Sequence, residues 1–456
     1  MPLLEPTLET VTTINDDGSR RFIHPADVHG RFSFLRAVAG VLLMAVYVAL
    51  PWIRINGNPA VFLDVEHRLV HLFGLTLAPQ DFWLGFFLIT GTGFALFYVT
   101  ALLGRVWCGW ACPQTVFLDL ARRVERFIEG DATARRRLDE SQWTPEKIGK
   151  RGLKNIVYGI FAVLLAHVFL SYFVSLRTLY SMASQSPAAH WGAFLFAFLT
   201  GGALWFDFAW FREQFCIVVC PYGRLQSALL DSDSIVIGYD QTRGEPRGKL
   251  NAAGAGDCID CRRCVQVCPT GIDIRHGLQM ECIACAACID ACDEVMEKIN
   301  RPRGLVRYDS MRGLEGKKRR FIRPRVALYT LLLLAGMGVM AASLSTFKPA
   351  TVSLLRMTGA PYYLEGGTIR NQFLMRIINK RNKIEVFHVK VLDMPPGSQI
   401  TGADDLIPVS ALAEQIRPLI VVAPQSEYHG LFPVRVLIST DDGAFSIEKT
   451  IPFLGP

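Results

Sequence analysis

Residues 256–294 set the architecture of this chain and read GDCIDCRRCVQVCPTGIDIRHGLQMECIACAACIDACDE. The stretch holds eight of the twelve cysteines in the sequence, in two runs that share the spacing C-x2-C-x2-C-x3-C. Thiols at this spacing bind the iron atoms of a [4Fe-4S] cluster. The first run is Cys258, Cys261, Cys264 and Cys268, and the second is Cys282, Cys285, Cys288 and Cys292. Together the two runs predict a small two-cluster ferredoxin-like domain.

The fourth cysteine of each run is expected to serve the cluster of the other run, as in two-cluster ferredoxins. One ligand set is then Cys258, Cys261, Cys264 and Cys292, and the other is Cys282, Cys285, Cys288 and Cys268. Zinc is the alternative, but zinc sites typically combine two CxxC pairs across a longer spacer. Cys292 is followed by Asp293 instead of the proline that follows the first run, and this carboxylate can shift the potential of one cluster.

The other four cysteines form two C-x3-C-P motifs, in VWCGWACPQT at 106–115 and FCIVVCPYGR at 215–224. The pairs are Cys108 with Cys112, before Pro113, and Cys216 with Cys220, before Pro221. On a continuous helix, residues four apart share one face, and the prolines would stop or kink the helix beyond the second thiol. If the pairs converge, they form a four-sulfur site suited to Cu(I), zinc or an iron–sulfur cluster. Buried thiols without a ligand, or a reversible disulfide, are the alternatives.

The distribution of cysteines favours reduced thiols that bind metal. All twelve lie between Cys108 and Cys292, whereas a secreted disulfide framework would spread over small extracellular domains. The net charge of +7 does not indicate nucleic-acid binding, because most of the basic excess lies beside apolar segments. The polar N-terminus has no signal-peptide pattern, and we expect it to stay uncleaved.

Five apolar segments are long enough to cross a bilayer, which takes about 20 residues. We place them at 37–53, 82–103, 156–176, 191–211 and 326–344. The connection at 104–155 holds eleven Lys or Arg, whereas the one at 54–81 holds two and the one at 177–190 holds one. The positive-inside rule therefore predicts a cytoplasmic N-terminus, cytoplasmic cysteines and an outer C-terminus.

These segments divide the chain into five parts. They are a cytoplasmic N-terminal segment at 1–36, four membrane helices with both C-x3-C-P motifs at 37–245, the ferredoxin-like domain at 246–310, a fifth membrane helix at 326–344 and an outer domain at 347–456. The last part contains short alternating stretches, such as EVFHVKVLDM and FPVRVLIST, between turn residues. This pattern predicts a small antiparallel β-sandwich with a docking or scaffold role.

Two polar features outside the cysteine motifs can be explained either by a function or by ordinary surface structure. Asp64, Glu66, His67 and His71 are candidate ligands of an outer metal ion, but a polar surface helix is the favoured interpretation. An amphipathic stretch at 119–130 either lies on the membrane surface or packs on neighbouring helices. Its apolar positions are Leu120, Val124, Phe127 and Ile128.

Further candidates lie within or beside the membrane segments. His167 and Asp207 fall inside predicted spans, where ionisable groups are often functional, and His167 is a candidate haem ligand or quinone contact. Arg212, Glu213 and Arg224 flank the second C-x3-C-P motif and are interpreted as positioning or interfacial charges.

In combination, WCGWACPQT, REQFCIVVCPYGRLQ, the double ferredoxin run and the outer β-sandwich resemble the CcoG family, also called FixG or RdxA. The resemblance covers nearly the whole chain. It implies a bacterial inner-membrane polyferredoxin with an immunoglobulin-like C-terminal domain, in which the eight ferredoxin cysteines hold two [4Fe-4S] clusters. It also implies a copper-handling or redox role for the C-x3-C-P thiols, namely Cys108, Cys112, Cys216 and Cys220.

The family is associated with reduction of Cu(II) to Cu(I) during assembly of the cbb-type haem–copper oxidase, and this is the function that the resemblance implies. The expected partners are the membrane, copper ions, a copper chaperone or transporter, subunits of the oxidase and an unidentified electron donor, but no nucleic acid. Two alternatives stay open: a quinol-linked electron-transfer subunit of a respiratory chain, and a non-catalytic scaffold for oxidase assembly.

Overall fold

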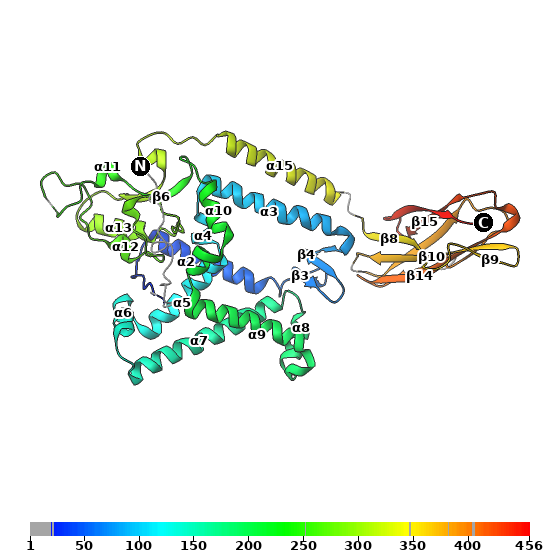
Figure 1. The fold of residues 1–456 in the computed structure, drawn as a ribbon, viewed down its shortest axis with the longest axis horizontal. Helices are drawn as coiled ribbons and strands as arrows, with labels where there is room; N and C mark the ends of the chain where they lie inside the picture. The colour runs from blue at the N-terminus through cyan, green and yellow to red at the C-terminus, as the bar shows by residue number, and fades with distance from the viewer. Residues whose placement is uncertain (1–19, 21, 251, 346–347, 382, 404–405) are drawn as a thin grey trace. The chain divides into compact units, whose positions relative to one another are not determined.

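A computed structural model describes residues 20, 22–250, 252–345, 348–381, 383–403 and 406–456 (Figure 1). Residues 1–19, about half of the predicted N-terminal segment, lie outside this description. The chain divides into two compact units. One comprises Met1–Ile53 and Phe86–Gly338, and the other comprises Arg54–Gly85 and Val339–Pro456. All twelve cysteines belong to the first unit.

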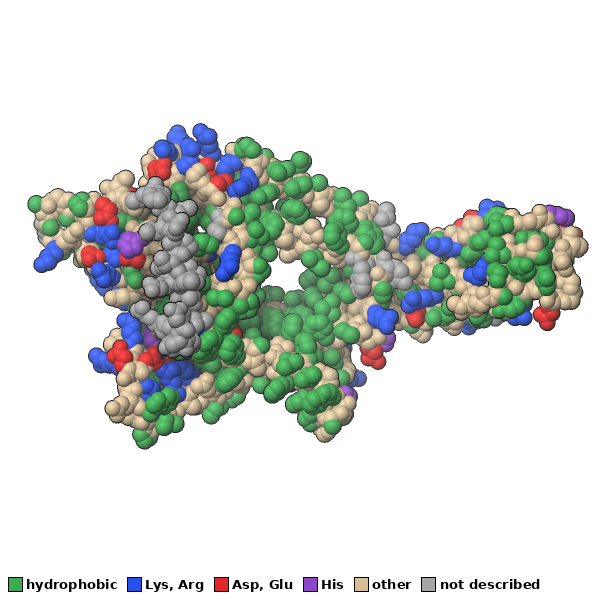
Figure 2. All heavy atoms as spheres, in the orientation of Figure 1, with side chains coloured by type: hydrophobic (Ala, Val, Ile, Leu, Met, Phe, Trp, Pro, Cys, Tyr) green, Lys and Arg blue, Asp and Glu red, His purple; other side chains and the backbone are tan. Residues whose placement is uncertain are grey.

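Within the described residues, five helical segments are long and apolar enough to cross a membrane. They are Arg31–Ala49 (α2), Trp83–Leu103 in α3 (Phe82–Leu103), Pro145–Leu170 (α7), Pro187–Phe211 around α9 (Trp191–Phe206), and Pro324–Ser345 (α15). In Pro145–Leu170 33% of the apolar window is buried in the protein, and in the other four spans the share is smaller, as expected for helices that face lipid. Figure 2 shows hydrophobic side chains over these helices. The predicted multi-pass membrane architecture is confirmed.

The structure corrects the ends of two predicted membrane segments. The first helix covers Arg31–Ala49 instead of 37–53, because the chain turns before Pro51. The third begins at Pro145 instead of 156, since the Thr144 side chain caps it by accepting a hydrogen bond from the Lys147 N–H group. It ends at Leu170 instead of 176, before a turn and the short helix α8 (Leu176–Ala183).

The ferredoxin region of the first unit lies between two antiparallel strands, β6 (Ile235–Tyr239) and β7 (Val306–Ser310). The predicted boundary at 246 therefore falls after the first of these strands. Two helices carry cysteines of this region, α12 (Arg263–Gln266) and α13 (Ala287–Lys298). Other described helices of the unit are α4 (Val106–Trp110), α5 (Pro113–Glu129), α6 (Ala132–Glu140), α10 (Pro221–Leu229), α11 (Gln241–Gly244) and α14 (Met311–Leu314).

The C-terminal part of the second unit is the predicted β-sandwich. One sheet has the strand order β12-β14-β10-β8, with β9 paired to β10, and the other has the order β13-β11-β15-β16. Alternate side chains face the shared core, where Phe373 and Phe387 from opposite sheets are buried. The strands are β8 (Ala350–Arg356), β9 (Tyr363–Glu365), β10 (Thr368–Asn379), β11 (Glu385–Leu392), β12 (Gln399–Thr401), β13 (Ile407–Val409), β14 (Glu414–Pro424), β15 (Phe432–Thr440) and β16 (Ser446–Phe453).

The connection between the first two spans is strand and turn, so the predicted polar surface helix is wrong. His71 lies on a strand with its ring buried against Phe62, and its Nδ1 atom is 2.9 Å from the Thr76 hydroxyl. His67 lies in an exposed turn and bonds to Asp64 at 2.8 Å. The two histidines therefore differ in burial and partner. The strands are β1 (Arg54–Ile55), β2 (Asn58–Pro59), β3 (Val61–Asp64), β4 (Leu69–Leu72) and β5 (Leu75–Leu77).

Candidate functional site

The eight ferredoxin cysteines line two adjacent cavities, each named here after the second cysteine of a run. The Cys261 cavity is lined by Cys258, Cys261, Cys264 and Cys292, with apolar neighbours that include Met296 and Leu305. The Cys285 cavity is lined by Cys264, Cys268, Cys282, Cys285 and Cys288, with apolar neighbours that include Ile237 and Ile274. Cys264 lines both, so the cavities share a wall. Each cavity contains the fourth cysteine of the opposite run, which is the exchange that the spacing predicts.

One type of turn presents both runs of cysteines. The residues on either side of the second cysteine have positive φ angles in each run. They are Asp260 and Arg262 at 52° and 53°, and Ala284 and Ala286 at 55° and 63°. Residues with a Cβ atom adopt this left-handed conformation rarely, because the Cβ is crowded by the backbone. The same backbone conformation occurs at equivalent positions of both runs, although the residue types there do not favour it. We infer that the turn is kept because it directs the thiol of the second cysteine toward the cavity.

The donor set of both cavities fits an iron–sulfur cluster. Cys258, Cys264, Cys282 and Cys285 are buried, whereas Cys261 is exposed. Burial raises the pKa of the Cys264 and Cys282 thiols to about 12, so a cationic metal is needed to hold them as thiolates at neutral pH. Among the described residues, no three His, Cys, Asp or Glu side chains converge on a single metal ion. The thiols surround a space, which is the arrangement that a four-iron cube requires.

Neither C-x3-C-P motif forms the predicted continuous helix, and in both a short helical turn ends before the second cysteine. Cys108 lies in the short helix α4, and Cys216 lies in a π-helical turn, η4 (Phe215–Val219). Cys112 and Cys220 occupy the N-cap positions of the next helices, α5 and α10, each with proline in the first turn. Proline is favoured there because an N–H group in the first turn has no acceptor within the helix, so its absence costs no hydrogen bond. The prolines therefore begin new helices instead of ending old ones.

The two motifs nevertheless lie together in the first unit. Burial first, and then the neighbouring thiols Cys112, Cys108 and Cys220, raise the pKa of the Cys216 thiol to about 12. The Cys108 thiol donates a hydrogen bond to Oε1 of Gln226 in α10, at 3.2 Å. The four half-buried thiols thus lie near one another, as the hypothesis of a common site requires, but among the described residues no three of them converge on one metal position.

Gln226 is a functional candidate that the sequence did not reveal. The residue is fully buried, and its Nε2 atom has no hydrogen-bond partner. A Cys108 thiol offers a proton to Oε1, whereas a Cys108 thiolate would accept a hydrogen bond from Nε2 after rotation of the amide. The amide can therefore form a hydrogen bond with either the thiol or the thiolate of Cys108. This suits a cysteine that loses its proton when it binds a soft metal ion.

The first C-x3-C-P motif packs directly against the second ferredoxin run. A Cβ atom on Gly109 would lie 2.5 Å from the Ile283 oxygen and 2.8 Å from the carbonyl carbon of Ala284, so this approach requires glycine. The buried Arg105 donates hydrogen bonds to the backbone oxygens of Met280 and, at 3.5 Å, Cys282. The turn that presents Cys282 and its neighbours is therefore held against the segment that carries Cys108.

A second contact joins the ferredoxin region to a membrane helix. The buried Asp290 of α13 accepts hydrogen bonds from the backbone N–H groups of Phe32 at 3.1 Å and Ser33 at 2.7 Å, in the first turn of α2. A carboxylate at this position satisfies free N–H groups and interacts favourably with the helix dipole. The helix that carries Cys288 and Cys292 is thus anchored to the first membrane span.

Comparison with known proteins assigns the family. Residues 211–311 match the model of a 4Fe-4S dicluster domain, 84–130 that of a 4Fe-4S binding domain, and 340–456 that of the IG-like fold at the C-terminal of FixG. The chain is 38% identical to protein RdxA of Cereibacter sphaeroides, over 88% of this chain and 89% of RdxA. It is 34% identical to nitrogen fixation protein FixG of Rhizobium meliloti, over 88% and 86% of the two chains. The chain belongs to the FixG/RdxA family.

A more distant relative is also a ferredoxin-type protein. The ferredoxin-type protein NapH of Haemophilus influenzae is 26% identical, over 59% of this chain and 90% of NapH. As a member of the FixG/RdxA family, the chain is a membrane-associated 4Fe-4S electron-transfer protein with a C-terminal immunoglobulin-like domain. The match at 84–130 includes the first C-x3-C-P motif, which the ferredoxin spacing alone does not cover.

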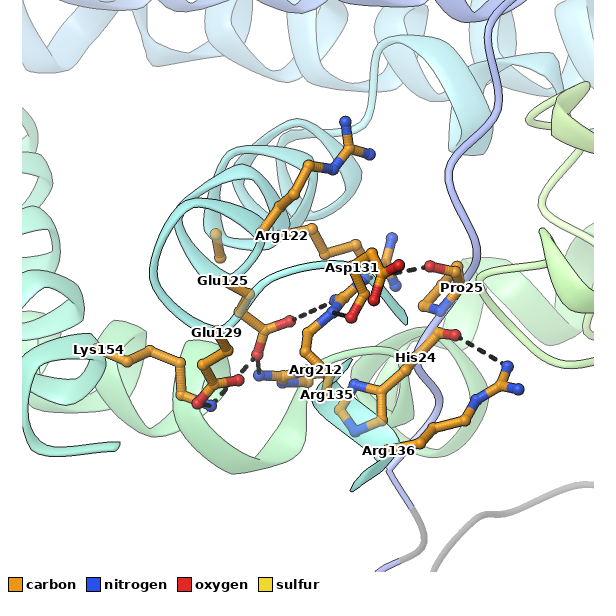
Figure 3. A network of polar contacts seen from close by, with 12 residues as sticks. His24, Pro25, Arg122, Glu125, Glu129, Asp131, Arg135, Arg136, Lys154 and Arg212 are labelled. Atoms are coloured by element: carbon orange, nitrogen blue, oxygen red, sulfur yellow. Dashed lines mark hydrogen bonds and ion pairs between the residues drawn. The ribbon is translucent and has the colours of Figure 1, made fainter. Parts of the chain in front are cut away.

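In this FixG/RdxA chain, a buried ionic network precedes the second C-x3-C-P motif (Figure 3). Glu125 of α5 is 1% exposed and pairs with Arg212, with Arg135 at 3.2 Å and with Lys154 at 3.5 Å. Although burial opposes ionisation, these cations lower the pKa of Glu125. Glu129, one turn further along α5, pairs with Lys154 at 2.8 Å. The predicted positioning role of Arg212 therefore has a structural basis.

The acidic members of this network were not predicted from the sequence. The stretch at 119–130 forms the C-terminal part of α5 and its C-cap, Gly130; the helix buries Glu125 and Glu129 and leaves Phe127 92% exposed. Leu118 and Ala121 of α5 pack with buried residues of α7, as the second interpretation of this stretch requires. The apolar spacing gave no sign of the inward carboxylates, because their partners lie on other helices.

The remaining candidates form hydrogen bonds or ion pairs with other residues of the chain. Asp207 accepts hydrogen bonds from the Gln114 amide at 2.8 and 2.9 Å, and Glu213 pairs with Arg20 at 3.1 Å. His167 lies 2.8 Å, through Nδ1, from the backbone oxygen of Val163 in its own helix. These contacts describe structural roles, and the haem and quinone hypotheses for His167 gain no support from them.

Proposed function

We propose that this chain is a cupric reductase in which electrons from the ferredoxin region convert Cu(II) to Cu(I) at the four C-x3-C-P thiols. The observation that carries the proposal is the contact of Gly109, which lies between Cys108 and Cys112, with the backbone at Ile283 and Ala284. This contact brings the two cysteine regions together at one boundary. An electron that crosses there moves from a ferredoxin-type site to a set of soft ligands.

The chemistry on both sides of this boundary suits copper. A bound [4Fe-4S] cluster supplies one electron at a time, and the reduction of one Cu(II) to Cu(I) consumes one electron. Thiolates are soft ligands that prefer Cu(I), so the C-x3-C-P cysteines would retain the product. Gln226 would then donate a hydrogen bond to the Cys108 thiolate and orient it.

The cellular context of the proposal comes from the family and the charge pattern. The Lys and Arg residues of the 104–155 connection support a cytoplasmic location for the cysteines and an outer location for the β-sandwich. The resemblance to proteins of cbb-type oxidase assembly supports transfer of Cu(I) to a chaperone or transporter in the inner membrane and then to the oxidase. The β-sandwich would serve as the docking domain.

The test compares the wild-type protein with the variant Cys258→Ser/Cys282→Ser. Both are reconstituted with iron and sulfide, reduced with dithionite, freed of excess reductant without air and mixed with Cu(II). A chelator that absorbs only as its Cu(I) complex measures the product, and protein that was never reduced is the control. The wild type should form Cu(I) faster than the variant. Equal rates would contradict the proposal.

A third iron–sulfur cluster is a second candidate for the C-x3-C-P thiols. The match of 84–130 to a 4Fe-4S binding domain favours it, because that segment contains Cys108 and Cys112. Two clusters give about eight iron atoms per chain, and a third would give about twelve. Under this candidate, Cys108→Ser/Cys216→Ser lowers the iron content by about four atoms. Under the copper proposal, the variant keeps its iron and loses copper binding.

A further inference from the structure

We propose that the two ferredoxin cavities have different roles: the Cys261 cavity receives electrons, and the Cys285 cavity passes them to the C-x3-C-P thiols. This inference rests on the proposed function and adds a direction to it. In the full sequence one electron leaves a reduced one-electron carrier protein, passes through both cavities in that order and reduces one Cu(II) to Cu(I). No covalent bond forms or breaks in the transfer.

The Cys261 cavity has the more exposed cysteine lining. Cys261 is exposed, whereas the cysteines of the Cys285 cavity are buried or half-buried. An open cleft adjoins this cavity, and Arg262 and Arg275 line both. Asp260 and Asp273, which also line the cleft, pair with Arg275 and fix its side chain. A soluble carrier protein can therefore approach Cys261 without displacing a buried segment.

The Cys285 cavity is instead connected to the C-x3-C-P region. The Trp110 indole N–H group donates to the Tyr308 hydroxyl at 3.0 Å, and Tyr308 donates to the backbone oxygen of Ala284 at 2.6 Å. Gly109 lies against the same turn. A packed and hydrogen-bonded path thus leads from the turn before Cys285 to the segment between Cys108 and Cys112.

Fixed positive charge lies beside the Cys285 cavity. Arg105 donates to the Cys282 oxygen at 3.5 Å, and Arg36 donates to the Cys285 oxygen at 3.4 Å. Arg36 also pairs with Asp119, which partly neutralises its charge. The contacts of Arg105 with the ferredoxin region are with the neutral backbone oxygens of Met280 and Cys282. Positive charge stabilises the more negative, reduced form of a cluster and raises its reduction potential.

A fixed carboxylate lies beside the Cys261 cavity. Asp293 directly follows Cys292, and its Oδ1 atom accepts a hydrogen bond from the Gly304 N–H group at 2.8 Å. This negative charge disfavours the reduced form of a cluster at Cys292. Arg262 and Arg275 also line the Cys261 cavity, so exposure and packing give the direction of transfer. Asp293 and Arg36 are the charges through which the potential of each cluster can be changed separately.

A redox titration followed by electron paramagnetic resonance tests this inference on the whole purified protein. Two midpoint potentials are expected, of which Asp293→Asn raises the lower one and Arg36→Gln lowers the higher one. Arg36→Lys keeps the charge and should leave both unchanged, and Arg105→Gln provides a second neutralisation if Arg36→Gln fails to fold. The inference is overturned if Asp293→Asn and the arginine variants shift the same potential, or if neither shifts any.

The contact itself is tested by Gly109→Ala, in which the new methyl group must separate the motif from the Ile283–Ala284 backbone. Gly149→Ala is the matched control, because a Cβ atom there meets nothing within 4 Å. Gly109→Ala should keep its iron content and its ability to accept electrons from dithionite, but should deliver them to Cu(II) more slowly than the control. Equal delivery would overturn the inference. If the wild type reduced no Cu(II), the proposed function would fail, and the redox titration would still decide between the cavities.

Discussion

The two groups of cysteines in this chain are brought together in different ways, one by close spacing in the sequence and the other by packing of distant segments. Each ferredoxin run places its thiols around a cavity through short intervals and a repeated left-handed turn, with one cysteine exchanged between the runs. The C-x3-C-P thiols come from two distant segments, and packing of α10 against α4 brings Cys108 to Gln226. The first site is specified by local spacing, whereas the second depends on the tertiary structure. Their ligands can therefore be tested separately.

Loss of one ligand should distinguish the two groups most strongly. Cys282→Ser removes a thiol of the Cys285 cavity, so we expect a loss of about four iron atoms per chain. Cys108→Ser should leave the iron content unchanged, because we propose that this thiol binds copper. Iron and acid-labile sulfide analysis of both purified variants measures the difference. If both variants lose the same amount, the two groups share one chemistry and the comparison fails.

The next effect concerns the buried amide beside Cys108. Gln226→Leu removes the hydrogen bond that Nε2 would give to a metal-bound thiolate, and such losses typically cost about 10- to 100-fold in metal affinity. Competition with a Cu(I) chelator measures the affinity, and the spectra of the ferredoxin clusters should not change. The exposed Gln425→Leu in the β-sandwich is the control. An unchanged Cu(I) affinity would show that Gln226 serves packing alone.

A smaller effect should follow from loosening the ferredoxin region from the membrane helices. Asp290→Ala leaves the N–H groups of Phe32 and Ser33 without their acceptor, and because these groups are only partly buried the cost is at most about 1–3 kcal/mol for each. Asp290→Asn keeps one acceptor oxygen and should be milder. Thermal loss of cluster absorbance should begin at a lower temperature in the alanine variant. Identical curves for both variants and the wild type would argue against this anchor.

The smallest effect is a pH dependence at the ionic network around Glu125, where His24 lies (Figure 3). Burial lowers the pKa of His24 from 6.5 to about 4. The unfolded chain binds a proton near the ordinary pKa while the folded chain does not, so stability present above pH 6.5 is lost as the pH falls toward 4. His24→Gln should flatten this part of the profile. Thermal unfolding between pH 4 and 8 measures it, and parallel profiles for variant and wild type would contradict the assignment.

Local patterns in the sequence predicted most of the fold. The cysteine spacing predicted the four cysteines of the Cys261 cavity and four of the five that line the Cys285 cavity, because three residues of each predicted set lie close together in the sequence. Apolar length predicted the five spans, since a bilayer imposes one requirement on each helix separately. Alternation predicted the longer strands of the β-sandwich, such as β11 and β15, because side chains of a strand point to opposite faces.

Features that depend on distant partners were predicted poorly. Pro113 and Pro221 are compatible with either the end of one helix or the first turn of another, and only the neighbouring structure decides. The spacing of His67 and His71 fits a helix, yet burial of His71 against Phe62 selects a strand. The network around Glu125 was missed for the same reason, because nothing within α5 reveals the cations that face it.

The central claim is that electrons leave the ferredoxin region through the C-x3-C-P thiols, and a single-turnover experiment tests it directly. Wild-type protein and Cys108→Ser/Cys216→Ser, both with full iron content, are reduced, freed of excess reductant and mixed with one equivalent of Cu(II) without air. Stopped-flow absorbance follows reoxidation of the clusters, and a Cu(I) chelator follows the product. We predict matched reoxidation and Cu(I) formation in the wild type and clusters that stay reduced in the variant. Equally fast reoxidation of the variant would contradict the claim.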